Sequence, residues 1–288
     1  MDGQKGISEK RSAGAVTVAL AAIGRLVMSA GGGFLSFVGG MSVLLGKVGN
    51  STMRDLFTPS RRFGKDALLG QMVRVGVKAI AIVVLIQMSI GMILPLQMYP
   101  MLEKFDQSEQ IASINAVAAF RELGPLMTAV VLCGFAGASI AAELGTMVTS
   151  EEIEALEASA LSPVRFLVVP RLLATVIMTI LLTVIADVVM IGSGVLTAIK
   201  LGIDPNTYYT LTLEAVDITG FITGLVKAAV FGLLIGLTAC YLGLSVKPWQ
   251  GSNGVGKATT NTVVYSLVAV MGADAIFTLI FYAYGLFS

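Results

Sequence analysis

The sequence predicts an all-α integral membrane protein with five transmembrane helices, preceded by an N-terminal interfacial or re-entrant helical segment. Of its 288 residues, 56% are hydrophobic and 13% are charged, and the mean hydropathy is +0.86, a composition outside the range of soluble domains. Several runs with at most one charge are long enough to cross about 30 Å of hydrocarbon as helices. Lysines and arginines gather in alternate connections between these runs.

Five runs meet the length requirement for a span. They are Ala79–Met98, Leu123–Ala142, Leu172–Ile199, Ile218–Val246 and Asn261–Phe287. Pro95 lies near the end of the first run and would break or kink that helix, because proline removes one backbone hydrogen bond. Gly220 with Gly224, and Gly232 with Gly236, are small residues four apart in the fourth run, which predicts close helix packing there.

The chain divides at residue 79 into an N-terminal region and a five-span domain, residues 79–288. We expect residues 1–25 to form a cytoplasmic tail, and residues 26–78 an interfacial or re-entrant segment followed by a basic linker. The run Leu26–Gly46 is long enough to span a membrane, but it contains six glycines, which weaken both helix formation and insertion. The sequence leaves open whether this run crosses the membrane or lies along it.

The distribution of basic residues predicts which side of the membrane each connection faces. Residues 47–78 contain seven lysines and arginines, whereas residues 99–119 contain one, Lys104. Because short cytoplasmic loops retain positive charge, the first strong span runs from the cytoplasm outward. Alternation then places residues 143–171 and 247–257 in the cytoplasm and the C-terminus outside.

The residue types present argue against an enzyme and against a catalytic, cofactor or metal site in this chain. The sequence contains no histidine, and its two cysteines, Cys133 and Cys240, lie far apart within apolar runs. Imidazole-based catalysis and zinc ligation are therefore excluded or unexpected. Nothing in the sequence indicates a nucleic-acid partner.

The stretch GSNGVGKATT, residues 251–260, nearly spells a phosphate-binding loop. Its glycines and lysine match G-x-x-x-x-G-K-[ST], but Ala258 stands where a hydroxyl would bind magnesium. A working loop of this kind follows a buried strand in an α/β domain, whereas this stretch connects two spans. We expect a glycine turn with Thr259 or Thr260 capping the last helix, and ATP and magnesium only on a separate subunit.

A short helix is predicted over residues 149–162, in the connection between the second and third spans. Thr149 and Glu152 fit a capping box at its start, and Pro163 marks its end. One face carries Ile153, Leu156 and Ala160, and the helix is acidic through Glu151, Glu152, Glu154 and Glu157. Such a helix is either an ordinary solvated loop or a docking surface for a basic groove on a cytoplasmic partner.

Three charged residues fall deep in the predicted spans, where a charge is costly and suggests function. They are Asp187, Lys227 and Asp274, which could neutralise one another across helices. They could form a structural ion-pair cluster, a substrate or gating site, or a proton relay. Arg121 and Glu122, at the expected outer end of the second span, are about 100° apart on a helix, which favours separate partners for the two side chains.

Five stretches resemble, in order, motifs of the MlaE-type permeases of ABC transporters that work with MCE proteins. They are RELGP, AAELGTM, SEEIEALE, SPVRFLVVPR and GVGKATT. The resemblance covers Gly70 to the C-terminus and is most specific over residues 121–171, although ASALSP at 158–163 departs from the family's M-G-V-D-P stretch. It implies a homodimeric permease of a bacterial inner membrane, with the N-terminus cytoplasmic and the C-terminus periplasmic. Its implied partners are cytoplasmic ABC ATPase subunits, an outer MCE-domain protein, and membrane lipids, with phospholipid or a related lipid as cargo.

The resemblance also implies roles for particular residues. The loop helix would be the coupling helix, contacting the ATPase through Glu151, Glu152, Ile153, Leu156 and Glu157. The candidate lipid path comprises Met92, Leu96, Met98 and Tyr99 as an apolar wall, with Arg121 and Glu122 at its outer mouth. Ordinary helix packing and an interfacial anchor are the alternative interpretations of these two groups.

Two functions of different classes are compatible with these features. The first is the permease subunit of an ATP-driven lipid transporter. The second is an ion-coupled secondary transporter that uses Asp187, Lys227 and Asp274 and needs no ATPase. No internal repeat is detectable, whereas many secondary transporters carry one, and this favours the first function.

Overall fold

The computed structural model describes residues 36–51 and 65–285. Residues 36–51 form one helix, which agrees with the expected helical segment ahead of the spans. The predicted tail at residues 1–25, residues 26–35 of the glycine-rich run and residues 52–64 of the basic linker lie outside the described residues. The chain divides into two units, Met1–Gly46 and Lys47–Ser288, and the second unit contains all five spans.

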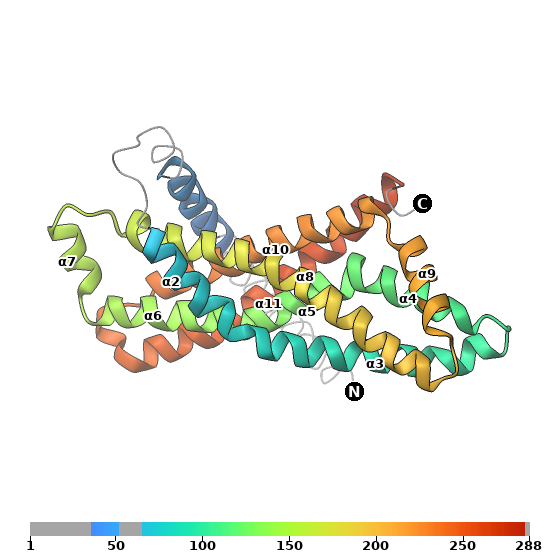
Figure 1. The fold of residues 1–288 in the computed structure, drawn as a ribbon. Helices are drawn as coiled ribbons and strands as arrows, with labels where there is room; N and C mark the ends of the chain where they lie inside the picture. The colour runs from blue at the N-terminus through green and yellow to red at the C-terminus, as the bar shows by residue number, and fades with distance from the viewer. Residues whose placement is uncertain (1–35, 52–64, 286–288) are drawn as a thin grey trace, which may run out of the picture. The chain divides into compact units, whose positions relative to one another are not determined.

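Five helical stretches are long and apolar enough to cross a membrane, which confirms the predicted fold class. They are Asp66–Glu103, Ser108–Thr149, Val164–Lys200, Ile218–Leu244 and Pro248–Ala283. They run alternately in opposite directions (Figure 1). No strand occurs in the described part of the chain.

Several of these stretches are built from consecutive helical segments. The first comprises α2, η2 and α3: Lys65–Val75, Val77–Ala79 and Ile80–Glu103. The second comprises η3, α4, η4, α5, η5 and α6: Ser108–Gln110, Ile111–Ala118, Ala119–Leu123, Gly124–Leu132, Cys133–Gly137 and Ala138–Thr149. The third comprises η6 and α8, Val164–Val168 and Val169–Lys200. The fourth is α10, Ile218–Leu244, and the fifth comprises η7 and α11, Pro248–Gln250 and Gly251–Ala283.

Two short helices lie at opposite ends of the bundle. Helix α7, Glu152–Ala158, joins α6 to η6, and helix α9, Pro205–Ala215, joins α8 to α10 (Figure 1). We call these ends the α7 end and the α9 end. The connections at residues 99–119 and 200–217 both contain helical structure, η3 with α4 in the first and α9 in the second.

Helices α8 and α10 form the centre of the bundle. Helix α8 packs against α3 and α10, and α10 packs against α6 and α11. Thr175, Thr179 and Thr183 are buried in α8, and each donates its hydroxyl to the carbonyl four residues earlier, at 2.7 to 2.8 Å. These hydroxyls need no partner on another helix, so polar side chains are accommodated in the apolar core.

Glycines allow the close approach of α10 to its neighbours, as predicted. A Cβ at Gly232 would lie 3.1 Å from the carbonyl oxygen of Thr175, and one at Gly236 would lie 2.7 Å from a side-chain carbon of Leu172. A Cβ at Gly224 would collide with the carbonyl oxygen of Phe120. Small residues thus let backbones meet where a membrane supplies no hydrophobic drive for helix association.

Of the predicted break or kink at Pro95, the break is wrong. Both Pro95 and Pro100 lie inside α3, which continues to Glu103. Pro95 is buried in a helix that packs along α8. A transmembrane helix tolerates proline because neighbouring groups can satisfy the freed carbonyl.

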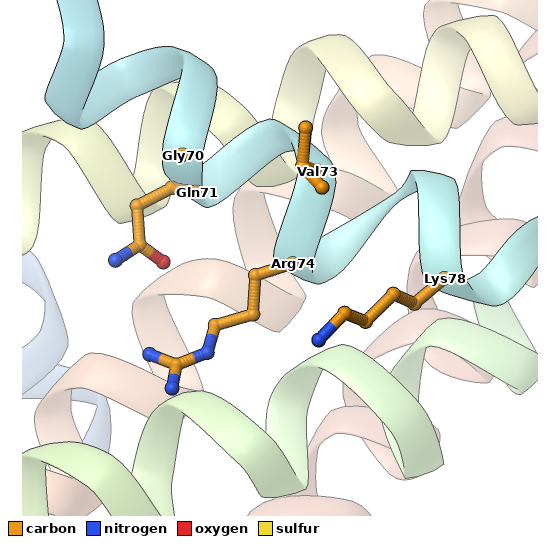
Figure 2. A pocket seen from close by; sticks show the side chains of 5 residues that line it. All are labelled: Gly70, Gln71, Val73, Arg74 and Lys78. Carbon is orange, nitrogen blue, oxygen red and sulfur yellow. The ribbon is translucent and has the colours of Figure 1, made fainter.

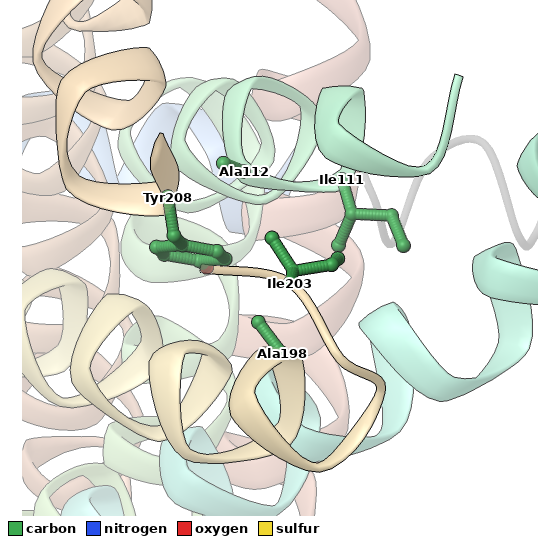
Figure 3. Close-up of a cluster of buried hydrophobic side chains, with 5 residues drawn as sticks. All are labelled: Ile111, Ala112, Ala198, Ile203 and Tyr208. Carbon is green, nitrogen blue, oxygen red and sulfur yellow. The ribbon is translucent and has the colours of Figure 1, made fainter. Parts of the chain in front are cut away.

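At the α9 end a small apolar cluster fixes the helical connections. Its buried members are Ile111, Ala112, Ala198, Ile203 and Tyr208, from α4, α8 and α9 with the turn before it (Figure 3). The Tyr208 hydroxyl accepts a hydrogen bond from Asn115 Nδ2 at 2.9 Å. Burial raises the pKa of Tyr208, which the hydrogen bond from Asn115 partly opposes, so the phenol stays protonated.

Candidate functional site

Helix α7 is shorter than predicted, and its start differs. It covers Glu152–Ala158, against an expected 149–162, and the predicted capping box is wrong. Thr149 is instead the last residue of α6, and its hydroxyl donates to the carbonyl of Thr146 at 2.9 Å. Glu151 sits at the N-cap with a left-handed φ of 61° and no side-chain cap. Because Thr149 still belongs to α6, it cannot cap α7.

The acidic side chains of α7 face outward, as the sequence indicated. The four glutamates of the segment are exposed, whereas Ile153 and Leu156 are half-buried, and α7 packs against α6. Ala160, expected on the apolar face, lies beyond the helix with a positive φ and is exposed. An acidic surface therefore projects from the end of the bundle, on a helix whose two half-buried side chains are aliphatic.

A carboxylate just below α7 ties three helical segments together. Glu143 Oε1 in α6 lies 2.6 Å from Arg74 Nη1 in α2 and 3.0 Å from Arg171 Nη2 in α8. The side chain of Arg171 is 5% exposed, and it also donates to the carbonyl of Leu167 at 2.8 Å. This cluster was not predicted from the sequence. The sequence contained one indication of this cluster, because Glu143 and Arg171 have opposite charges and lie at the two ends of the connection that contains α7.

The charges inside the bundle form a cluster that differs from the predicted one. Lys227 Nζ in α10 lies 2.7 Å from Glu122 Oε1 in η4 and 3.0 Å from Asp274 Oδ1 in α11. The contact with Asp274 is an ion pair without hydrogen-bond geometry, whereas Glu122 Oε1 also accepts from Thr278 at 3.0 Å. Lys227 is 1% exposed, so its charge is balanced almost entirely by these neighbours.

Asp187 is not a member of this cluster, which corrects the prediction that three charges would neutralise one another. It is buried in α8 against Gly124, where a Cβ would collide with Asp187 Oδ1. That oxygen has no hydrogen-bond partner within the described residues. Beside it, Gln87 Nε2 in α3 donates to the carbonyls of Leu123 and Gly124, at 3.2 and 3.4 Å.

Arg121 and Glu122 lie well inside the second span, not at its outer end as predicted. The span begins at Ser108, because the connection before it is helical. Both residues belong to η4, a π-helical turn, and both are half-buried. Glu122 pairs with Lys227, and the side chain of Arg121 lies against Gly220.

The four predicted wall residues are not brought to one face. Met92, Leu96 and Tyr99 are spaced four and three apart on α3 and share a face, from which Met98 points away. Leu96 is 52% exposed and the other three are half-buried. The Tyr99 hydroxyl donates to Glu103 Oε1 at 3.1 Å. Three of the four residues therefore share one face of α3, on which Tyr99 also packs against the apolar cluster at the α9 end.

The stretch GSNGVGKATT is helical throughout, not a turn. Helix α11 begins at Gly251, and the hydroxyls of Thr259 and Thr260 donate to carbonyls four residues earlier. The predicted threonine cap is therefore wrong, because the helix starts two turns earlier than expected. At the actual start, Gln250 accepts from the backbone N–H of Lys247 at 3.1 Å. No group of potential metal ligands was found among residues 36–51 and 65–285.

Comparison with known proteins covers the same part of the chain as the helix bundle. The sequence matches the family model Permease MlaE over residues 68–280. It is 34% identical over 212 residues to a probable ABC transporter permease protein of Rickettsia typhi, covering 73% of this chain and 81% of the relative. It is 32% identical over 220 residues to the intermembrane phospholipid transport system permease protein MlaE of Haemophilus influenzae, covering 76% and 84%. It is also 31% identical over 215 residues to the protein TRIGALACTOSYLDIACYLGLYCEROL 1, chloroplastic, of Arabidopsis thaliana, covering 74% and 61%.

The family match includes the whole bundle, from α2 through the apolar part of α11. The motif-bearing segments, with Glu122, Glu143 and α7, fall inside it. Because the match extends over most of the chain, the protein belongs to the MlaE permease family.

Proposed function

We propose that this chain is the permease subunit of an ATP-driven ABC transporter that moves phospholipid or a related lipid between the inner membrane and an MCE-domain partner. The observation that carries the proposal is the family match over the whole helix bundle, α7 included. The names of two relatives supply the transporter class and the cargo, since one is an ABC transporter permease and another a phospholipid transport permease. ATP and magnesium would reside on a separate ATPase, and a second copy of this chain would complete the permease.

Helix α7 is the proposed contact with the ATPase. Its segment presents four exposed glutamates, while Ile153 and Leu156 are half-buried, which suits a basic groove on a soluble partner. A movement of α7 would reach the spans directly. Glu143 joins α6 to α8 and α2, so these segments would move together when the ATPase pushes.

The proposed lipid path lies toward the α9 end. Met92, Leu96 and Tyr99 supply an apolar surface, and Glu122, whose side chain is 34% exposed, is the most accessible member of the buried charge cluster. A lipid needs an apolar wall for its chains and a polar contact for its headgroup. Arg121, on the same π-helical turn, adds a cation suited to a phosphate.

Orientation is part of the same proposal: the α7 end faces the cytoplasm, and the C-terminus faces the periplasm. The excess of basic residues before the first span supports this arrangement. A cysteine introduced at Glu157 should react with an impermeant thiol reagent from the cytoplasmic side of sealed vesicles. Reaction from the opposite side would reverse the orientation.

The first experiment is a mild detergent extraction of the tagged full-length chain from its native membrane, with mass spectrometry of the proteins and lipids that copurify. The wild type should bring down an ABC ATPase, and Glu151→Lys with Glu152→Lys and Glu157→Lys should lose it, because like charges would then face a basic groove. The matched control reverses three exposed glutamates near the α9 end, Glu103, Glu109 and Glu214. Loss of the ATPase in both variants, or in neither, would contradict the assignment of α7.

Ion-coupled transport is the second candidate, favoured by the buried cluster around Lys227. Asp187 lies apart, so its relay would run through Glu122 and Asp274. This function predicts that Asp274→Asn abolishes lipid or solute movement while charge reversal on α7 is tolerated. The ATP-driven function predicts that reversal on α7 uncouples transport.

A further inference from the structure

A cavity of about 320 Å³ lies at the α7 end, beside the segment that leads into the first span. It is lined by Gly70, Gln71, Val73, Arg74 and Lys78, from α2 and η2 (Figure 2). In that view the side chains of Arg74 and Lys78 extend to the same side of the segment. We propose that this cavity binds the phosphate headgroup of an anionic phospholipid, held in the leaflet at the α7 end. This site is separate from the transport path and does not rest on the proposed function.

The charges around the cavity are not balanced. Arg74 and Arg171 share the single carboxylate of Glu143, at 2.6 and 3.0 Å. Lys78 is exposed and has no ion-pair partner among the described residues. Three cations therefore face one carboxylate, which leaves an excess of two positive charges. A phosphate ester would accept from Lys78 and from the free N–H groups of Arg74, and would neutralise part of this excess.

The spacing of residues on the segment provides room for a headgroup. Gly70 and Arg74 are four apart in α2 and so share a face of that helix. Lys78 lies beyond the turn at Gly76, in η2, and its side chain extends to the same side as that of Arg74 (Figure 2). No atom lies within 4 Å of the position that a Cβ would occupy at Gly70. The glycine leaves an open space above the guanidinium, where a larger side chain would stand.

Exposed apolar side chains form a second row on the same segment. Leu69 and Val73 are four apart in α2, Val77 follows in η2, and the three are 57%, 49% and 49% exposed. In water such a row would be costly, whereas against acyl chains it is favourable. Cationic and exposed apolar side chains on one segment match a lipid, which carries both a phosphate and chains, better than they match a free phosphate.

The depth of the site also fits a headgroup. Lys78 is the last charged residue before the uncharged run Ala79–Met98, so the cavity lies where the hydrocarbon core gives way to the polar interface. Basic residues at this boundary attract anionic lipids, each worth about a fivefold gain in binding. The bound lipid would bridge α2 and the Glu143 cluster that ties α6 to α8.

The test uses the full-length chain, delipidated in detergent, with three probes: phosphatidylglycerol, phosphatidylcholine and glycerol 3-phosphate. Native mass spectrometry counts bound lipid, and thermal unfolding measures protection. Two variants target the site differently: Lys78→Gln removes one charge, and Gly70→Phe fills the space without changing charge. The control is Lys257→Gln, which removes an exposed lysine near the same end, on α11. Size-exclusion profiles and the unfolding temperature without lipid confirm that each variant is folded.

We expect tighter binding of phosphatidylglycerol than of phosphatidylcholine, weakened about fivefold by Lys78→Gln and by Gly70→Phe and unchanged by Lys257→Gln. Equal binding by all four proteins would overturn the site. Displacement of the lipid by glycerol 3-phosphate at similar concentrations would overturn the lipid as occupant, since acyl chains would then contribute nothing. Neither of these two failures would contradict the proposed transport function, because that function is tested separately, by copurification of the ATPase with the wild type and the α7 variant.

Discussion

Replacing Lys227 with methionine should destabilise the protein strongly, because the lysine is the positive centre of a buried charge cluster. Its Nζ lies 2.7 Å from Glu122 Oε1, 3.0 Å from Asp274 Oδ1 and 3.1 Å from Thr278 Oγ1, and the side chain is 1% exposed. Methionine has a similar length and no charge, so Lys227→Met creates little cavity. Its cost is that two carboxylates lose their counter-charge in an apolar interior.

The expected decrease in the free energy of unfolding follows from the loss of this counter-charge. Removing one partner of a buried ion pair costs about 3–5 kcal/mol. Glu122 and Asp274 are 34% and 16% exposed, and partial hydration places the expected value near the lower end of this range. A loss of about 3 kcal/mol should lower the unfolding temperature by on the order of 10 °C in a chain of this size.

The assay is thermal unfolding of the purified chain in detergent, followed by intrinsic fluorescence. Lys257→Met is the matched control, because Lys257 is an exposed lysine of α11 and its loss should change stability by less than about 0.5 kcal/mol. Adding Glu122→Gln and Asp274→Asn to Lys227→Met should recover much of the loss, since a neutral cluster has no unpaired charge. Equal unfolding temperatures for Lys227→Met and the wild type would refute the claim that the lysine holds these carboxylates.

Two further predictions concern helix packing and capping. Gly224→Ala should destabilise the protein by about 1–3 kcal/mol, because its Cβ would meet a backbone carbonyl of η4. Gly134→Ala should be neutral or stabilising, because no atom lies within 4 Å of its Cβ position. Equal unfolding temperatures for the two variants would contradict this prediction. Asp204→Ala should cost about 1 kcal/mol, because the carboxylate accepts from the N–H groups of Asn206 and Thr207 at the start of α9. Hydrogen exchange should then quicken in α9 but not in α7, and unchanged protection of α9 would count against the cap.

The positions of the spans could be predicted from the sequence because the hydrocarbon core of a membrane requires long, mostly apolar runs of residues. Five apolar runs correspond to five helices, and each observed stretch contains most of the run predicted for it. The ends were less accurate, since helices continue beyond the hydrocarbon into polar sequence. Helix α11 begins at Gly251, ten residues before the predicted run at Asn261, so the apparent phosphate-binding loop is helix.

The partners of the intramembrane charges could not be predicted in the same way. Segments η4, η5 and η6 are π-helical turns, each of which adds a residue to a turn and rotates the next part of the helix by about 100°. The rotation at η4 sets the direction in which Glu122 points, and therefore its pairing with Lys227. A sequence pattern based on regular helical periodicity does not show where such a rotation occurs. Asp187, expected to join Lys227, lies instead against Gly124.

The Glu143 cluster illustrates a second limit. Arg74, Glu143 and Arg171 come from three spans and are far apart in the sequence, and each alone resembles an ordinary charge at a membrane boundary. Only the crossing of α2, α6 and α8 brings one carboxylate between two guanidinium groups. The cavity beside Arg74 was likewise not predicted, because it depends on how the side chains around Gly70 are arranged in space.

The sequence by itself determined the class of the protein, the number of spans, the acidic helix α7 and the family, because these depend on composition and on local order along the chain. The tertiary structure decided which charges pair, which candidate wall residues share a face of α3, and how Glu143 joins α2, α6 and α8. Those properties depend on how helices rotate and cross, and the free energy of packing that sets rotation is shared among residues from every span. A linear pattern records which residues must be buried, but it does not record their neighbours.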